Sequence, residues 1–297
     1  MAIVALADVI FGAATIRQVT NTNHQTGMTL RKGMTSGGAV IAQVSGKSAA
    51  EVTQITSSDL ATLLGLNTGA FISAGALVSA GTITVPLKVR ANGGTFASGS
   101  VNKSITGANG FLVPTSIECT QDGDNDATCQ ADLHWLSADG VTKGADDASG
   151  LALGAQSFNA EFALGPVYIN TTLIVGVQSV RITPGLEIEK PPLGSGAVWP
   201  TMAMIKSIVP TIEITVNDFD AVANTIGDFT AMTSANCYLR RRVDSGLYSA
   251  STDNIRFTFA AGLADTNSVT VANMDDGSAT ITLHGKTLTT STAVAIP

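Results

Sequence analysis

The segment Asn254–Gly285, NIRFTFAAGLADTNSVTVANMDDGSATITLHG, decides the fold of this chain. It holds three short runs with strand character, separated by clusters rich in turn-forming residues at 262–267 and 273–277: Ile255–Phe259, Ser268–Val271 and Ala279–His284. Apolar and polar residues alternate in the first run, which is the period of a strand with one buried face. The segment predicts an antiparallel meander, with Ile255–Phe259 in the main sheet and 273–277 as an exposed tip.

The second face of this meander is polar with little charge. Thr258 and Thr282 belong to it, and hydroxyl groups of this kind can meet another subunit at a small desolvation cost. We expect charges introduced at Thr258 and Thr282 to block assembly and to leave the monomer folded.

The composition points in the same direction. Charged residues make up 13% of the 297 residues, about half of the roughly 25% that is typical of soluble domains. A chain with so few surface charges is expected to have much of its surface covered by partners, although a secreted β-rich protein with a neutral exterior has a similar composition. The net charge of −7 argues against a basic groove that neutralises nucleic-acid phosphates.

The rest of the chain is typical of a mainly β protein: an antiparallel β-sandwich or barrel with one short flanking helix and long loops. The helix is expected at about 57–66, where Ser57 or Ser58 caps a stripe of three leucines. Two polar, glycine-containing stretches are expected to be loops: 21–38, as a long loop or arm, and 91–110.

The strongest linker signal is Pro191–Gly196, which places a candidate boundary near residue 193. Residues 1–193 would form the sandwich or barrel with its N-terminal arm. Residues 194–297 would form a second β unit or continue the same sheet. The segments 113–122 and 209–218 resemble each other, which indicates either a duplicated β unit or a chance similarity of strand sequences.

Asp122, Asp124 and Asp126 are the candidate metal ligands, because they match the first, third and fifth positions of a calcium loop. The sixth position is Ala127, where the loop requires Gly, and the twelfth is Leu133, where it requires Glu. A solvated turn between two strands is therefore favoured over a bound ion.

No catalytic pattern is present in the sequence. His24, His134 and His284 lie in unrelated contexts, so we expect no enzyme activity, no catalytic or cofactor-binding residues and no cofactor. Cys119 and Cys129 flank the acidic turn and can either pair or pack as free thiols, and the second alternative is favoured.

Arg240, Arg241 and Arg242 form the one basic run. It fits either a sheet edge protected by charge or a patch for an acidic neighbouring subunit. The uncharged stretch Leu60–Leu87 is interrupted by Gly residues, Asn67 and Pro86, so no membrane span is expected.

The layout resembles that of bacteriophage tail tube proteins. The likeness lies in a β-rich chain with one short helix, low-charge loops and an acidic balance, and locally in Thr56–Gly65 after an extended arm and in the closing meander Asn254–Gly285.

This resemblance implies a virion structural protein of the viral tail, assembled in the host cytoplasm. Its sheets would join those of neighbours into a homo-oligomeric ring, commonly a hexamer. The rings would stack into a tube, with long loops between them, and would contact other tail proteins. DNA would pass through the lumen during ejection without specific binding. Six copies carry 6 × (−7) = −42 charges, which fits an acidic lining that repels phosphate. The alternatives are a capsid or surface-decoration protein, and a secreted β-rich adhesion or carbohydrate-binding module.

Overall fold

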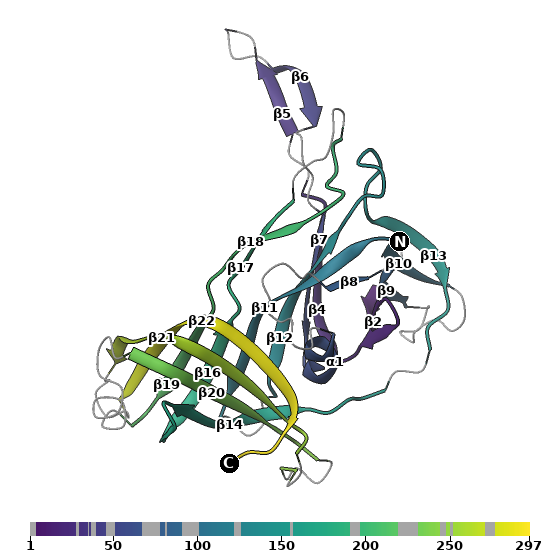
Figure 1. Ribbon diagram of the computed structural model, residues 1–297. Coiled ribbons are helices and arrows are strands. Elements are labelled where there is room, and N and C mark those ends of the chain that lie inside the picture. The colour runs from purple at the N-terminus through teal and green to yellow at the C-terminus, as the bar shows by residue number, and fades with distance from the viewer. Residues whose placement is uncertain are drawn as a thin grey trace.

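The computed structural model describes residues 4–27, 30–34, 36, 40–45, 51–66, 78–80, 82–90, 101–121, 126–154, 157–190, 197–218, 231–243, 248–249, 252–270 and 277–297. Within these residues the chain is mainly β, with antiparallel sheets and one short helix (Figure 1). The predicted fold class is therefore confirmed. None of the sheets formed by the described strands closes into a barrel.

The main sheet has twelve strands. Eleven of them follow one another in the order β15 (Thr172–Ile174), β14 (Phe162–Ile169), β20 (Ala231–Arg241), β21 (Asn254–Thr270), β22 (Ser278–Val294), β19 (Thr211–Val216), β16 (Val177–Thr183), β11 (Gly110–Thr120), β12 (Thr128–Trp135), β7 (Val52–Ser57) and β4 (Val19–Gln25). The twelfth, β8 (Val78–Ala80), pairs with β11. The four strands that follow residue 193, β20, β21, β22 and β19, lie together between β14 and β16, which precede it. The linker 191–196 itself lies outside the described residues.

The two similar segments of the sequence are β11 and β19, and they flank the same strand. Glu118 of β11 and Glu213 of β19 both lie opposite Arg181 of β16. Their apolar neighbours Ile117 and Ile212 both lie opposite Ile182, on the buried face. The two similar segments thus occupy equivalent positions, one on each side of β16.

A second sheet of six strands lies beside the main one (Figure 1). Its order is β13 (Asp146–Leu151), β10 (Asn102–Gly107), β9 (Ile83–Val89), β2 (Val9–Phe11) and β3 (Ala14–Ile16), and β1 (Val4–Leu6) also pairs with β9. Two separate pairs are β17 (Leu186–Glu189) with β18 (Met204–Ile208), and β5 (Leu30–Met34) with β6 (Val40–Ser45).

Both loop predictions were partly wrong. Residues 19–25 and 30–34 are the strands β4 and β5, and residues 102–107 are β10. β4 and β5 lack apolar periodicity because β4 lies at a sheet edge and β5 in a two-stranded ribbon, where backbone pairing holds them in place. β10 lies between β9 and β13, and its buried residues Asn102 and Ser104 are polar, so it has no apolar pattern either. Residues 91–100 of the second predicted loop lie outside the described residues.

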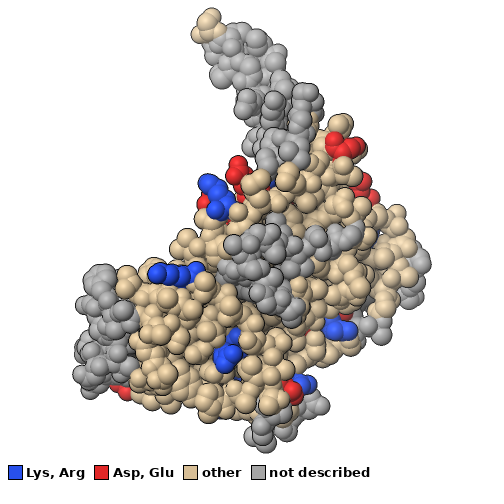
Figure 2. All heavy atoms as spheres, in the orientation of Figure 1, with Lys and Arg blue, Asp and Glu red and all other residues tan. Residues whose placement is uncertain are grey.

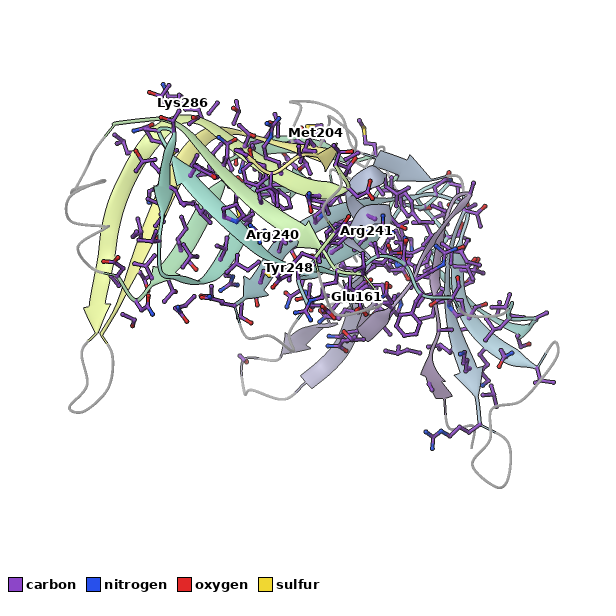
Figure 3. All side chains as sticks on the ribbon, turned by 90° about the horizontal axis from the view of Figure 1, so that it is seen from below. Glu161, Met204, Arg240, Arg241, Tyr248 and Lys286 are labelled. Atoms are coloured by element: carbon purple, nitrogen blue, oxygen red, sulfur yellow. The ribbon has the colours of Figure 1, made fainter. Side chains whose placement is uncertain are left out.

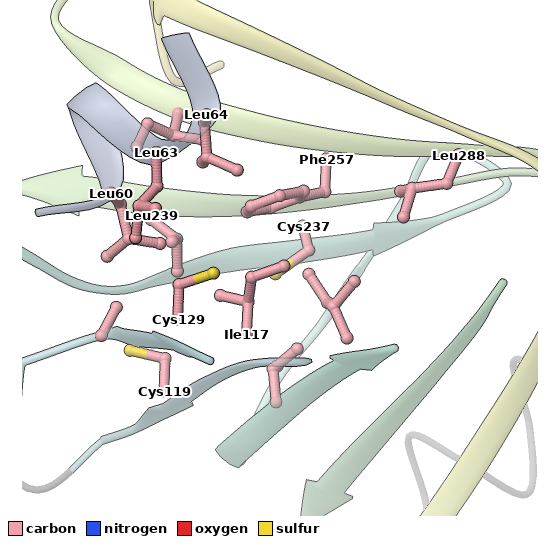
Figure 4. Close-up of a cluster of buried hydrophobic side chains, with 14 of the residues drawn as sticks. Leu60, Leu63, Leu64, Ile117, Cys119, Cys129, Cys237, Leu239, Phe257 and Leu288 are labelled. Atoms are coloured by element: carbon pink, nitrogen blue, oxygen red, sulfur yellow. The ribbon is translucent and has the colours of Figure 1, made fainter. Parts of the chain in front are cut away.

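The main sheet curls, so that strands from its two halves contribute to one core. Ile117, Cys119 and Cys129 come from β11 and β12, and Cys237, Leu239 and Phe257 come from β20 and β21 (Figure 4). Strict alternation produces this buried face: in β19, Ile212, Ile214 and Val216 are fully buried whereas Glu213 is exposed.

The closing segment forms one long hairpin, which differs from the predicted three-stranded meander. β21 and β22 have 17 residues each and stay paired through the expected turn at 262–267. Gly262 lies opposite Gly285, and a Cβ at Gly262 would overlap the carbonyl oxygen of His284. Because residue 262 has no side chain, β21 and β22 can stay paired next to Ala261, whose φ is 45°. Ile255–Phe259 does belong to the main sheet, whereas 273–276 of the expected tip lie outside the described residues.

The helix α1 spans Leu60–Gly65 and is shorter than expected. Leu60, Leu63 and Leu64 are buried in the core, as the leucine stripe predicts. Its N-cap is Asp59, because Ser57 is still paired in β7 and uses its hydroxyl oxygen to accept from the Asp59 backbone N–H.

Asp59 joins three parts of the chain. Its fully buried carboxylate accepts hydrogen bonds from the Thr62 N–H at 3.2 Å, the Arg17 N–H at 2.9 Å and the Asn159 side-chain amide at 2.8 Å. Arg17 precedes β4, and Asn159 precedes β14. One carboxylate therefore ties the helix to the segments that lead into strands near both ends of the main sheet.

We predict that Asp59→Ala lowers the free energy of unfolding by about 3 kcal/mol, because it removes the cap and leaves buried donors without an acceptor. Asp59→Asn keeps one acceptor oxygen and should lose less. Urea unfolding followed by circular dichroism measures both. Equal stability of Asp59→Ala and the wild type would contradict this role.

Candidate assembly surface

One end of the main sheet is an unprotected edge. β4 pairs with β7 on one side, and no described strand pairs with it on the other. Its sequence, VTNTNHQ, contains no charged residue and no proline, and its single bulge lies at its beginning, between Val19 and Asn21. Edge strands in soluble monomers normally carry charges, prolines or bulges that prevent pairing with another chain. β4 has little of this protection.

The other end of the sheet is also open. β15 pairs only with β14 among the described strands, through a two-residue turn in which Asn170 and Thr171 have φ 49° and 72°. Leu173 and Val175 are 46% and 48% exposed at this end. The sheet thus presents a polar edge at one end and a partly apolar edge at the other.

The hairpin β5–β6 projects away from the body of the protein (Figure 1). Neither strand packs extensively on any other described element. An isolated two-stranded hairpin is at best marginally stable in water. A ribbon of this kind is therefore suited to contact a partner.

The outer face of the main sheet carries few charges. Glu118, Arg181 and Glu213 form a row across β11, β16 and β19, and Arg181 Nε lies 3.1 Å from Glu118 Oε1. Around this row the face is mostly hydroxyl and amide groups. Figure 2 shows one side of the molecule, on which uncharged residues cover most of the described surface.

The expectation that charges at Thr258 and Thr282 would leave the monomer folded does not fit the structure. Thr282 is only 5% exposed, and Thr258 donates its hydroxyl to Asn236 Oδ1 at 2.8 Å. A charge at either position would disturb the fold as well as any contact. The exposed positions of this polar surface are elsewhere, for example at Gln130 and Thr289.

Arg240 and Arg241 end the strand β20, which runs between β14 and β21, and Arg242 follows directly. Of the two alternatives for this basic run, the charge-protected sheet edge was therefore wrong. Arg241 pairs with Asp253 at 2.9 Å and Arg242 with Asp126 at 3.3 Å. Arg240 lies over the ring of Tyr248, 5.4 Å from its centroid (Figure 3). Two of the three charges are thus balanced within the chain.

Arg241 and Arg242 also line an open hollow of about 700 Å³ with residues 158–161 and 243. Phe158, which is 84% exposed, stands at its rim. The charged groups of this hollow already have partners in the chain, and the Glu161 carboxylate accepts from the Gln18 amide at 3.3 Å.

The structure places only one of the three candidate metal ligands. Asp126 forms the ion pair with Arg242, whereas Asp122 and Asp124 lie outside the described residues. Within the described part of the chain, no group of three or more His, Cys, Asp or Glu residues is arranged to hold a metal ion.

The three cysteines are free and buried, as the favoured alternative predicted. Burial raises the pKa of Cys119 and Cys129 to about 12 and also raises the pKa of Cys237. At neutral pH these thiols are protonated and act as small apolar side chains in the core (Figure 4).

The sequence did not reveal the most perturbed titratable pair. Lys190 Nζ lies 2.7 Å from His134 Nδ1, and the His134 ring stacks on Phe111 with centroids 4.7 Å apart. Burial, together with the Lys190 charge, lowers the pKa of His134 to about 3. Burial lowers the pKa of Lys190 to about 8. The two residues are far apart in the sequence, and no spacing motif could have joined them.

The remaining histidines do not join this pair. His24 Nδ1 lies 2.8 Å from the Thr53 hydroxyl, which also accepts from Trp135 Nε1 at 2.9 Å, and burial lowers the pKa of His24. His284 is exposed on β22. The described histidines therefore lie at three separate places.

No protein-family profile matches this chain, and no curated protein is similar to it. Among the residues that the structure describes, no helix is long and apolar enough to cross a membrane.

The contact between His134 and Lys190 makes the free energy of unfolding depend on pH. The folded-state pKa of His134, about 3, lies below the ordinary value of 6.5, so its contribution to stability is present above pH 6.5 and is lost as the pH falls toward 3. We predict that from pH 7 to pH 4.5 the wild type loses about 2 kcal/mol more than His134→Gln, which stays neutral and can still accept from Lys190. Urea unfolding at both pH values measures the difference. Parallel losses in the two proteins would contradict the assignment.

Proposed function

We propose that this chain is a structural protein that assembles with copies of itself through the free edges of its main sheet, as a ring-forming subunit of a phage tail tube. The observation that carries the proposal is β4, an edge strand of seven residues without charge or proline. Strand addition at such an edge satisfies backbone groups that otherwise bond only to water.

The two edges of the sheet differ, which favours a head-to-tail contact. β4 of one copy would meet the β14–β15 edge of the next, where Leu173 and Val175 are exposed. A contact between two different surfaces forms a ring when its rotation closes. In a closed ring no such edge stays open, so the strands that expose a monomer to aggregation become the means of assembly.

The projecting hairpin β5–β6 supports contact between rings. It leaves the body at the end opposite the C-terminus (Figure 1), and neither of its strands packs extensively on another described element of its own chain. A neighbouring ring, or another tail protein, would supply that partner.

The outer face of the main sheet is suited to line a conduit. Its charges are few, and Arg181 is held between Glu118 and Glu213. Without a free basic stripe such a face would not hold DNA phosphates, so DNA would pass without specific binding. The protein would then act in the virion, after assembly in the host cytoplasm.

The edge contact is tested by placing two lysines on β4. Asn21 and Asn23 are both exposed. We predict that Asn21→Lys with Asn23→Lys remains monomeric at concentrations where the wild type forms rings or larger species. The change in Tm should be within about 2 °C, because exposed substitutions rarely alter stability much. Sedimentation velocity measures the assembly state.

The matched control is Gln130→Lys with Thr289→Lys, which adds the same charge at exposed positions outside β4 and β15, on β12 and on the part of β22 that pairs with β21. The control should assemble like the wild type. If the β4 variant also assembled, or if the control were blocked equally, the edge would not be the contact.

A further inference from the structure

Lys190 differs from Lys143 and Lys206 in the partner of its amine. It follows β17, and its amine meets the neutral ring nitrogen Nδ1 of His134 at 2.7 Å. Among the described residues no carboxylate lies within 4.0 Å of it. In contrast, Lys143 Nζ lies 3.1 Å from Asp146 and Lys206 Nζ lies 2.7 Å from Glu187. Lys190 is also half-buried, so its ammonium is partly removed from water without a counter-ion in direct contact.

The surroundings of Lys190 are fixed by the fold. His134 stacks on Phe111 of the adjacent strand β11, which orients the imidazole toward the amine. Asp132, two residues before His134 on β12, is the other titratable group facing the amine. Its carboxylate acts on the amine only at a distance, and it accepts a hydrogen bond from the Gln54 amide at 3.4 Å.

These contacts determine how much of the amine is neutral. With a pKa of about 8, set mainly by burial and opposed by Asp132, roughly a quarter of the Lys190 amine is neutral at pH 7.5. For an ordinary lysine the neutral fraction at this pH is about one in a thousand. The carboxylate of Glu187 raises the pKa of Lys206 above the ordinary value. Lys206 is therefore less often neutral than an ordinary lysine, and its reaction rate serves as the internal reference for that of Lys190.

We infer that Lys190 is a covalent modification site, at which small activated acyl donors acylate this chain in preference to its exposed lysines. The neutral amine attacks the acyl carbon and forms a C–N bond. The bond from that carbon to the leaving group breaks, and the leaving group departs with the electron pair. The amine proton passes to water, because His134 is too weak a base to hold it. The product is an uncharged amide beside Asp132.

Acylation of Lys190 does not require assembly of the chain, and it changes the charge beside β12. Acylation removes the positive charge from the contact between β12 and the segment that follows β17.

The test is pulse acetylation of the full-length protein with sub-stoichiometric sulfosuccinimidyl acetate, followed by peptide mass spectrometry. At pH 7.5 we expect Lys190 to react on the order of tenfold faster than Lys206. The gain in neutral fraction exceeds this, but a less basic amine is also a weaker nucleophile. At pH 11 the Lys190 amine is almost fully neutral and gains little, whereas the neutral fraction of the more exposed Lys206 is far larger than at pH 7.5, so the ratio of the two rates should fall.

Asp132→Asn separates ionisation from exposure. It keeps the Oδ1 acceptor for Gln54 and removes the charge that raises the pKa of Lys190. Acetylation of Lys190 should therefore become faster at pH 7.5 and stay unchanged at pH 11. Slower labelling of Lys190 than of Lys206 at pH 7.5, or a ratio that is the same at both pH values, would overturn the inference. So would an Asp132→Asn variant whose labelling at pH 7.5 matches that of the wild type.

Discussion

The structure depends on the burial of one apolar face of a single antiparallel sheet. A sheet with alternating residues cannot leave that face in water, so it must curl or find a second layer. Here it curls, and Phe257 and Leu239 from one half enter the same core as Ile117 and Cys129 from the other. Helix α1 adds Leu60, Leu63 and Leu64 to this core. The buried carboxylate of Asp59 then ties the helix to segments near both ends of the sheet.

A core built by curling one sheet leaves open sheet edges, and these edges bear on function. A curled sheet that does not close leaves its first and last strands with a neighbour on one side only. Chains that remain monomeric normally protect such strands with charge, yet β4 is uncharged and exposed. The low charge of the whole chain, 13% of its residues, fits the same explanation. Surface that is destined for contact with another copy gains little from ionic groups.

Alternation in the sequence predicted the parts of the fold in which one face is buried. It identified the strand Ile255–Phe259, the hairpin on either side of the acidic turn and the leucine stripe of the helix. It failed where pairing alone holds the backbone, as in β4 and β5. It also failed at Gly262, where a turn was expected and a bent strand is found, because only the partner strand shows that the glycine maintains a close backbone approach. The His134–Lys190 contact joins residues 56 positions apart and has no local signal.

The central claim is that this chain assembles with copies of itself into rings through its sheet edges. Negative-stain electron microscopy of the purified protein over a range of concentrations tests it most directly. The account predicts closed rings with a central opening at high concentration, some of them stacked into short tubes. A protein that stays monomeric at every concentration, or that forms only particles without a central opening, would contradict it.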